Sequence, residues 1–349
     1  MRAWGGVPVR AVCLTPRRSL DLCDLTLPEP SAGQVRVRVE YVGICGSDLH
    51  YYYHGENAGF VLKEPLIPGH ELSGTVDLDP TGRWSPGAAV TAHPARYGPP
   101  QKHWSEHPHL WPGGSYLGSA STWPHTQGAL ADFILVDAEM LRTLPAGLST
   151  RTAALAEPLG VSLHGVRVAG GVEDARVLVA GAGPIGLLSV AAARAEGAAD
   201  ITVSDVMTGP LERARLLGAD HTVDVSAETL PESSYDVVLE CSGAGASVSS
   251  ALKAVRPAGT VVQVGMISDD SPGPSIGPLV TKEVTLRGAF RFSDELDDAL
   301  ALLASERRIA SVITHEFSLE AAHEAFVTAA DPELSGKVLI SLRSVPPPG

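Results

Sequence analysis

A glycine pattern between an apolar strand and a helix constrains the fold of this chain more than any other feature. Residues 177–186 read Val-Leu-Val-Ala-Gly-Ala-Gly-Pro-Ile-Gly, and a helix is expected over 187–196. Glycines in the spacing G-x-G-x-x-G allow a tight turn, and they let backbone N–H groups at a helix N-terminus approach a pyrophosphate. The motif therefore predicts a dinucleotide-binding α/β unit. Its expected cofactor-binding residues are Gly181, Gly183, Pro184, Ile185 and Gly186.

An acidic residue at the end of the next expected strand, 201–205, completes the pattern. Asp205 follows the glycines by about 20 residues, where a carboxylate accepts hydrogen bonds from the adenosine ribose hydroxyls. The same carboxylate would repel a 2′-phosphate, and the three residues after it carry no positive charge. NAD(H) is therefore favoured over NADP(H), with Arg213 and Arg215 as the nearby cations that leave NADP(H) open.

The apolar segments of the chain follow two different patterns. Before residue 150 they are short and bounded by Gly or Pro, and in 34–42 apolar and charged residues alternate as in a strand with one solvated face. Beyond that point fully apolar strands alternate with helical segments, which is typical of a doubly wound parallel sheet. We expect an α/β protein with a β-rich domain over 1–157, a nucleotide-binding domain over 158–292 and a return to the first domain over 293–349.

Composition and charge exclude several classes of protein. The 349 residues include 26 Lys and Arg against 40 Asp and Glu, a net charge of −14 without a basic cluster, so no nucleic-acid partner is expected. The longest uncharged stretch, 177–193, is short for a membrane span, and the N-terminus does not read as a secretory signal. Four scattered cysteines do not form a disulfide framework, so we expect a cytoplasmic protein without membrane contact.

Metal-binding residue types are concentrated in two short segments of the first domain. Residues 43–50 read Gly-Ile-Cys-Gly-Ser-Asp-Leu-His, and 69–71 read Gly-His-Glu. Sulfur, imidazole and carboxylate ligands together suit Zn²⁺, and three protein ligands with one open position form a catalytic site. Glu157 is a further candidate ligand. A single Cys or His is more often an ordinary core residue, so the spacing alone leaves a metal site and a structural role equally open.

Taken together, these motifs resemble the polyol branch of the zinc-dependent medium-chain dehydrogenase/reductase superfamily. The resemblance runs essentially end to end, and it implies a GroES-like catalytic domain with a Rossmann cofactor domain. It also implies a homo-oligomer, either a dimer or a tetramer. The motifs that carry it are Cys-Gly-Ser-Asp-Leu-His-Tyr at 45–51, Gly-His-Glu at 69–71, Ala-Glu-Pro-Leu at 156–159, Gly-Ala-Gly-Pro-Ile-Gly at 181–186 and Arg-Gly-Ala-Phe-Arg-Phe at 287–292.

The resemblance implies a zinc ligand set. Cys45 and His70 would bind the ion, and Glu71 or Glu157 would complete its coordination directly or through water. Asp48 would accept a hydrogen bond from His70 and orient its ring.

It also implies residues that act on the substrate. Ser47 would lie beside the substrate oxygen, and His50 would pass the proton to solvent. Tyr51, Phe60 and Arg291 would shape or contact the substrate, with plain packing or a surface ion pair as the alternative for each.

One feature common in this family is missing. Many members bind a second, structural zinc ion through C-x₂-C-x₂-C-x₇-C, and that spacing falls here on Tyr97, Pro100, His103 and Trp111. We therefore expect one catalytic zinc ion per chain and no structural zinc. The four histidines of the 93–109 segment are expected to lie in a solvated loop. An apolar cluster of Trp104, Trp111 and Tyr116 is expected to replace the missing metal.

The expected reaction is the reversible oxidation of a secondary alcohol. Zinc would lower the pKa of the substrate hydroxyl, and the proton would leave through Ser47, a cofactor hydroxyl and His50. Hydride would pass to the nicotinamide. Arg291 and His125 would make the substrate site cationic, which favours a sugar acid: L-idonate oxidised to 5-keto-D-gluconate. A sorbitol or xylitol dehydrogenase is the alternative. A zinc-free NADPH-dependent quinone or enone reductase and a non-catalytic binding protein are less favoured.

Overall fold

A computed structural model of the protein describes residues 6–16, 19–267 and 272–343. Its contacts divide the chain into two compact units. The first unit comprises the residues up to Glu157, His315–Ala330 and the residues from Lys337 onward, and the second comprises Pro158–Thr314 and Asp331–Gly336. The chain first passes from one unit to the other between Glu157 and Pro158, close to the point where the pattern of apolar segments changes.

Seven strands, most of them paired antiparallel, form the main sheet of the first unit. They join in the order β11-β7-β6-β3-β19-β18, and β10 also pairs with β3. The alternation expected in β3 is found in its burial, because Val35, Val37 and Val39 are all buried. The strands are β3 (Gln34–Gly43), β6 (Glu71–Leu78), β7 (Ala89–Ala92), β10 (Phe133–Asp137), β11 (Leu141–Thr143), β18 (Ile313–Ser318) and β19 (Lys337–Ser341).

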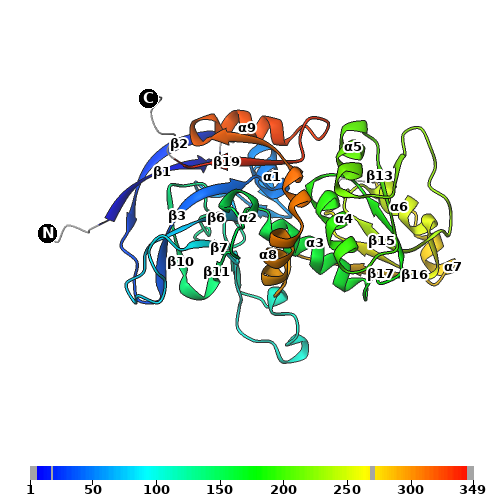
Figure 1. The fold of residues 1–349 in the computed structure, drawn as a ribbon, viewed down its shortest axis with the longest axis horizontal. Helices are drawn as coiled ribbons and strands as arrows, with labels where there is room; N and C mark the ends of the chain where they lie inside the picture. The colour runs from blue at the N-terminus through cyan, green and yellow to red at the C-terminus, as the bar shows by residue number, and fades with distance from the viewer. Residues whose placement is uncertain (1–5, 17–18, 268–271, 344–349) are drawn as a thin grey trace. The chain divides into compact units, whose positions relative to one another are not determined.

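Shorter elements complete this unit. Strands β1 and β2 form an antiparallel ribbon, and helix α9 lies along β19 (Figure 1). The remaining elements are β1 (Gly6–Leu14), β2 (Leu20–Pro28), α1 (Gly46–His54), β4 (Glu56–Asn57), β5 (Phe60–Val61), β8 (Ala95–Arg96), β9 (Ser115–Tyr116), α2 (Thr150–Ala153), α9 (Ala322–Ala329), and the 3₁₀ helices η1 (Lys102–Trp104), η2 (Pro108–Leu110), η3 (Ala138–Met140) and η5 (Leu319–Ala321).

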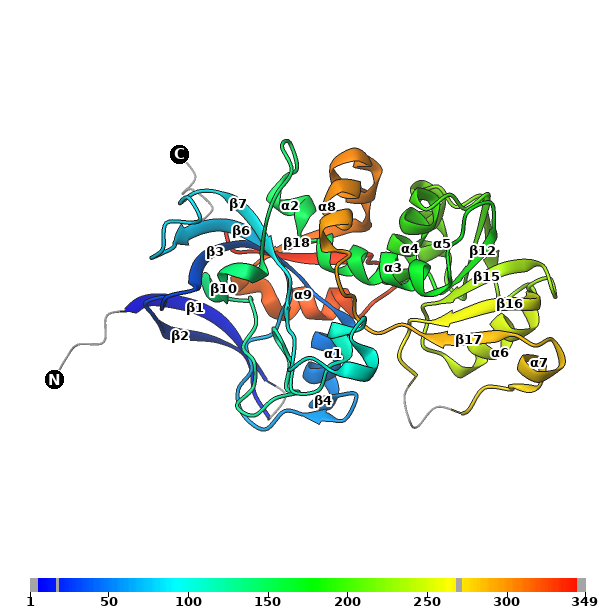
Figure 2. The ribbon, with the colours of Figure 1, turned by 90° about the horizontal axis from the view of Figure 1, so that it is seen from below.

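Six parallel strands form the sheet of the second unit. Their order β14-β13-β12-β15-β16-β17 corresponds to 3-2-1-4-5-6 in chain order, which is the Rossmann arrangement. Helices α4 (Pro184–Ala195) and α5 (Thr208–Leu217) cover one face of this sheet, and α6 (Gly245–Ala254) covers the other (Figure 2). The strands are β12 (Arg176–Ala180), β13 (Asp200–Asp205), β14 (His221–Asp224), β15 (Tyr235–Glu240), β16 (Val255–Gln263) and β17 (Thr285–Gly288).

One helix of the second unit, α8, was expected in the segment that returns to the first domain. Helix α8 follows β17 and buries Leu296, Leu300 and Leu303, and the 3₁₀ helix η4 contacts α4 and α5. Residues 293–314 therefore cluster with the second unit, whereas the expected return segment begins at 293. The helices are α3 (Ala156–Val168), α4 (Pro184–Ala195), α5 (Thr208–Leu217), α6 (Gly245–Ala254), α7 (Gly277–Thr281), α8 (Leu296–Ser305) and η4 (Arg307–Val312).

The later part of the return does complete the first unit. Phe326 of α9 is 1% exposed and packs in the same core as Val338 and Ile340 of β19 and the buried valines of β3. None of the helices in the described ranges has the length and apolar character needed to cross a bilayer.

Candidate functional site

Three side chains with metal-binding atoms meet in the first unit. Cys45 is the N-cap residue of α1, and His70 and Glu71 lie where the chain enters β6. The Cys45 sulfur, a ring nitrogen of His70 and a carboxylate oxygen of Glu71 lie within 4.8 Å of one another. Antiparallel pairing of β3 with β6, in which Gly43 lies opposite Glu71, brings the two sequence segments together.

Gly43 provides the space for one of these ligands. A Cβ atom at Gly43 would lie 2.0 Å from Oε2 of Glu71, so a side chain at this position would displace the carboxylate. A glycine that ends a strand is compatible with such a close approach, and its position in the sequence was a usable signal.

The cluster has the properties of a cation site. Among the described residues, Nδ1 of His70 and Oε2 of Glu71 are buried without a hydrogen-bond partner, at a cost of about 1–3 kcal/mol for each group. Burial alone would lower the pKa of His70, but Cys45, Asp48 and Glu157 outweigh it and raise the pKa to about 10. A cation held by the Cys45 sulfur, a ring nitrogen of His70 and a carboxylate oxygen of Glu71 would replace that proton, and these S, N and O donors suit Zn²⁺.

Lys337 is a residue of this cluster that the sequence analysis missed. It begins β19 and is 2% exposed, and its Nζ donates to Oε1 of Glu71 at 2.6 Å and to the carbonyl of Ile44 at 3.0 Å. Burial would lower the pKa of Lys337, but the Glu71 carboxylate outweighs it and raises the pKa. Lys337 thus occupies one oxygen of Glu71 and leaves the other, Oε2, to the cluster. A lysine at the start of an apolar strand was the available signal.

Glu157 lies beside the three-residue cluster and has a partner of its own. It is buried at the start of α3, and its Oε1 accepts a hydrogen bond of 2.6 Å from the Tyr116 hydroxyl. Burial raises the pKa of Glu157 even though His70 is close. The Tyr116 ring meets the His70 ring edge-on at 5.4 Å, so Tyr116 belongs to this site.

The expected apolar cluster of Trp104, Trp111 and Tyr116 is therefore wrong. Trp104 is exposed, and Trp111 donates from Nε1 to the Trp104 carbonyl at 3.1 Å, with its ring 6.4 Å from that of Tyr97. Tyr116 is turned toward Glu157 because burial of that carboxylate requires a hydrogen-bond donor.

Asp48 fixes the backbone near the ligands, and the hydrogen bond expected from His70 is not formed. Its Oδ2 accepts the N–H of Cys45 at 2.9 Å, and its Oδ1 accepts the N–H of Gly69 at 3.1 Å. The buried carboxylate thereby joins the start of α1 to the residue that precedes His70.

Helix α1 also carries the two residues expected to move a proton. Ser47 and His50 are three positions apart and are therefore neighbours on the helix surface. Burial and the ring of His54, 5.6 Å away, lower the pKa of His50. The imidazole is neutral at neutral pH and able to accept a proton.

The two aromatic residues expected to shape the substrate site differ in exposure. Tyr51 is 1% exposed, and its hydroxyl accepts a hydrogen bond from the N–H of Ala120, so its ring serves the core. Phe60 is 39% exposed and lines a hollow of 230 Å³ together with Trp123 and Lys63.

The structure removes one argument for a cationic site. Nε2 of His125 accepts the backbone N–H of Lys63 at 2.9 Å, and Nδ1 donates to the Thr122 carbonyl at 2.9 Å. A ring nitrogen that accepts an amide hydrogen carries no proton, so this arrangement holds His125 neutral. The expectation that His125 adds positive charge is wrong.

The glycine loop of the second unit has the expected form. Gly181 has φ +97°, and a Cβ atom there would lie 2.8 Å from the N atom of Ser242; one on Gly186 would lie 1.9 Å from the Gly181 carbonyl oxygen. At Gly183, by contrast, a Cβ atom would meet nothing within 4 Å. The first and third glycines are needed for packing, and the second leaves room for a pyrophosphate at the N-terminus of α4.

The other expected residues of the nucleotide site lie around this loop. Pro184 is the first residue of α4, and the carbonyl of Ile185 accepts a hydrogen bond from Ser162 of α3. Asp205 ends β13 and accepts the N–H of Ala182, within the loop, at 2.7 Å. Arg291 lies between β17 and α8, with its guanidinium 4.7 Å from the centre of the Phe290 ring.

Replacing Lys337 tests whether the buried ion pair supports the cluster. We expect Lys337→Met to lower the free energy of unfolding by about 3–5 kcal/mol, because Glu71 keeps a buried charge without a partner. Adding Glu71→Gln should recover part of the loss. All five tryptophans precede residue 158, so denaturant unfolding followed by tryptophan fluorescence reports on the first unit. The exposed Lys102→Met is the control, and an equal effect of both lysine variants would contradict the expectation.

Comparisons with known proteins agree with both units. Residues 31–146 match the family model of the alcohol dehydrogenase GroES-like domain, and residues 184–305 match that of zinc-binding dehydrogenases. Sorbitol dehydrogenase of Gallus gallus is 36% identical over 335 residues, which cover 91% of this chain and 92% of that protein. D-xylulose reductase of Saccharomyces cerevisiae is 34% identical, with 90% and 92% covered.

A solved structure shows the same architecture. L-idonate 5-dehydrogenase from Escherichia coli superposes with a TM-score of 0.91 at 30% identity, over 97% of this chain and 99% of that chain. The likeness in fold thus extends over nearly the whole length of both chains. The chain belongs to the zinc-dependent medium-chain dehydrogenases of the polyol type and is an oxidoreductase.

Proposed function

We propose that this dehydrogenase oxidises a secondary hydroxyl of a sugar acid, with NAD⁺ as the hydride acceptor and one zinc ion held by Cys45, His70 and Glu71. The observation that carries the proposal is the cluster of half-buried Cys45 with buried His70 and Glu71, in which a ring nitrogen and a carboxylate oxygen are unpartnered among the described residues. L-idonate oxidised to 5-keto-D-gluconate is the reaction proposed.

The two glutamates have different roles in this proposal. Glu71 binds the ion through Oε2, since Lys337 holds its other oxygen. Glu157 borders the site and is oriented by Tyr116. None of the four positions of the structural-zinc spacing is a cysteine, which supports one ion per chain.

The chain's own residues supply the proton path. Bound zinc contributes Lewis acidity that makes a substrate hydroxyl acidic near neutral pH, and the nicotinamide accepts hydride. Ser47 receives the hydroxyl proton, and His50, whose pKa is lowered, accepts it and releases it to solvent.

Contacts around α5 support NAD(H) over NADP(H). Arg213, one of the cations that left NADP(H) open, donates to the carbonyls of Pro332 and Glu333. The Glu333 carboxylate accepts the N–H of Gly209 at 3.1 Å in the first turn of α5, where an anion would otherwise bind. A 2′-phosphate would therefore meet two carboxylates, Asp205 and Glu333, and an arginine that is already engaged.

A neutral polyol is the second candidate substrate. The neutral His125 and the likeness to sorbitol dehydrogenase favour it, whereas Arg291 and the likeness to L-idonate 5-dehydrogenase favour a sugar acid. We also propose a cytoplasmic homo-oligomer, either a dimer or a tetramer; its four free cysteines are compatible with a reducing compartment.

Removing the thiol ligand tests the zinc proposal. Purified protein should contain about one zinc ion per chain, and Cys45→Ala should lose both the ion and turnover. NADH should still bind, because the glycine loop belongs to the second unit. Elemental analysis and NADH fluorescence give the two readouts, with Cys23→Ala as the control. Full activity without zinc would instead indicate the zinc-free reductase.

Replacing Asp205 tests the cofactor proposal. Asp205→Ser should raise kcat/KM for NADP⁺ relative to NAD⁺ by about tenfold, because two like charges 4 Å apart repel by about 1 kcal/mol in water and more strongly near a protein surface. Adding Glu333→Gln should raise this ratio further, because the substitution removes the carboxylate charge from the first turn of α5. Asp200→Ser, at the other end of β13, is the matched control. A wild-type enzyme that prefers NADP⁺ would contradict the proposal.

A substrate panel tests the reaction itself. L-idonate, other aldonates, sorbitol and xylitol should be compared by kcat/KM with NAD⁺ and NADP⁺, and L-idonate should be preferred. Arg291→Ala should raise KM for the aldonate about 10–100-fold, which corresponds to the loss of a charged hydrogen bond worth about 1.5–3 kcal/mol. The KM for polyols should change less, and Arg287→Ala should change neither. A much higher kcat/KM for sorbitol or xylitol would assign the enzyme to the polyols.

A further inference from the structure

We propose that the buried pair of His164 and Glu295 positions Arg291 for the substrate, by fixing the turn that carries this arginine to helix α3. The inference rests on the substrate-binding role proposed for Arg291. Neither His164 nor Glu295 is part of the metal cluster or of the glycine loop.

The turn holds Arg291 in a conformation that the residue itself does not favour. Residues 289–295 connect β17 to α8, and Arg291 has φ +56°, in the left-handed region. For a residue with a side chain this conformation costs about 1–2 kcal/mol. The surroundings of the turn must therefore hold it in place.

Phe292 is the first anchor of the turn. It directly follows Arg291 and is 1% exposed. A Cβ atom on Gly160 of α3 would lie 3.3 Å from Cγ of the Phe292 ring, so the ring lies directly against the helix backbone at a glycine. The side chain on one side of Arg291 is thereby fixed to α3.

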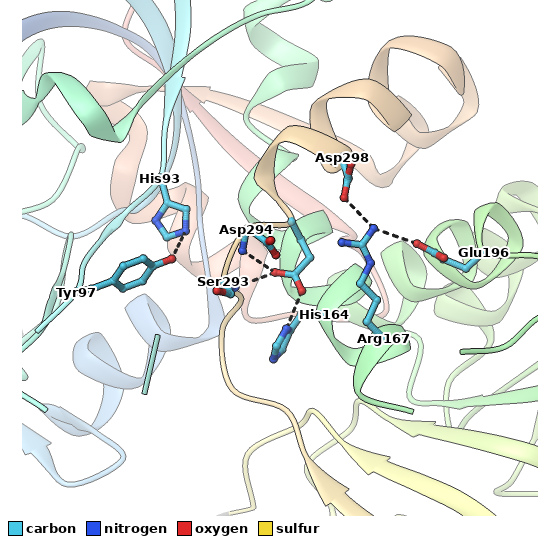
Figure 3. A network of polar contacts seen from close by, with 9 residues as sticks. His93, Tyr97, His164, Arg167, Glu196, Ser293, Asp294 and Asp298 are labelled. Carbon is cyan, nitrogen blue, oxygen red and sulfur yellow. Dashed lines mark hydrogen bonds and ion pairs between the residues drawn. The ribbon is translucent and has the colours of Figure 1, made fainter. Parts of the chain in front are cut away.

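Glu295 is the second anchor. Its Oε1 lies 2.8 Å from Nδ1 of His164 on α3, and its Oε2 accepts the N–H groups of Ser293 at 2.8 Å and Asp294 at 3.1 Å (Figure 3). One carboxylate therefore closes the turn on itself and joins it to α3. Both side chains are largely buried, so water competes little for these bonds.

The charge of Glu295 is well defined. Burial would raise its pKa, but the hydrogen bond from His164 and the backbone donor at Ser293 outweigh burial and lower the pKa to about 2. The carboxylate is therefore ionised at neutral pH and can accept hydrogen bonds from the turn and from His164 together.

A nearby ion pair provides a matched control. Arg167, also on α3, lies 2.8 Å from Asp298 of α8 and 3.2 Å from Glu196 (Figure 3). The contact with Asp298 joins α3 to the same helix α8, whereas Glu196 is the residue that follows α4. Both contacts are exposed and do not reach the turn. Exposed pairs of this kind contribute about 0–1 kcal/mol.

Steady-state kinetics should separate positioning from plain stability. The relevant substrate is the one whose KM rises in Arg291→Ala. For this substrate, His164→Phe and Glu295→Ala should each raise KM about tenfold and leave kcat within about twofold of wild type. His164→Asn keeps a donor and Glu295→Gln keeps an acceptor, so both should restore most of the affinity. Arg167→Ala should leave KM unchanged. Hydrogen exchange at Ser293 and Asp294 should be faster in Glu295→Ala but not in Arg167→Ala.

A double-mutant cycle decides the inference. In an Arg291→Ala background, His164→Phe should raise KM no further, because the residue it positions is gone. If His164→Phe folds poorly, Gly160→Ala, which pushes the Phe292 ring by a few tenths of an ångström, takes its place. The positioning role would be overturned if His164→Phe changed KM equally in the wild-type and Arg291→Ala backgrounds, or if it reduced stability without changing KM. Either result would leave the substrate-binding role of Arg291 intact. If Arg291→Ala changed no KM, the role of Arg291 and this inference would fall together.

Discussion

The buried ion pair between Lys337 and Glu71 is the interaction on which the metal cluster depends. Glu71 is 1% exposed, and an unpaired carboxylate at that depth would take up a proton or disrupt the packing. Its partner comes from β19, 266 residues further along the chain. The cluster of Cys45, His70 and Glu71 therefore becomes complete only when the chain has passed through the second unit and β19 has paired with β3.

Carboxylates that accept backbone N–H groups recur in four segments of the described chain. Such an acid holds two amide groups at once and needs no counter-cation, which suits a chain with a net charge of −14. The same device serves the start of α1, the glycine loop, the loop after β15 and the turn after β17. The acids are Asp48, Asp205, Glu240 and Glu295.

The errors of the sequence analysis share one cause. From sequence, Asp48 is expected to meet the His70 ring, Tyr116 to pack with two tryptophans, and His125 to carry a positive charge. In each case the residue type allowed several partners, and the partner is chosen by segments distant in sequence: Gly69, Glu157 and Lys63. The helix over 296–305 shows the same limit, because an apolar face indicates burial without indicating the sheet that it covers.

Local patterns in the sequence determined the glycine loop, the parallel strands, the acid at the end of β13 and the residue types of a zinc site. Each of these follows from the spacing of neighbouring residues or from backbone constraints, which are readable without a fold. Tertiary structure alone decided that Lys337 holds one oxygen of Glu71, that His125 is neutral and that His164 meets Glu295. Those outcomes depend on burial and on hydrogen-bond partners that folding brings together, and no local pattern encodes them.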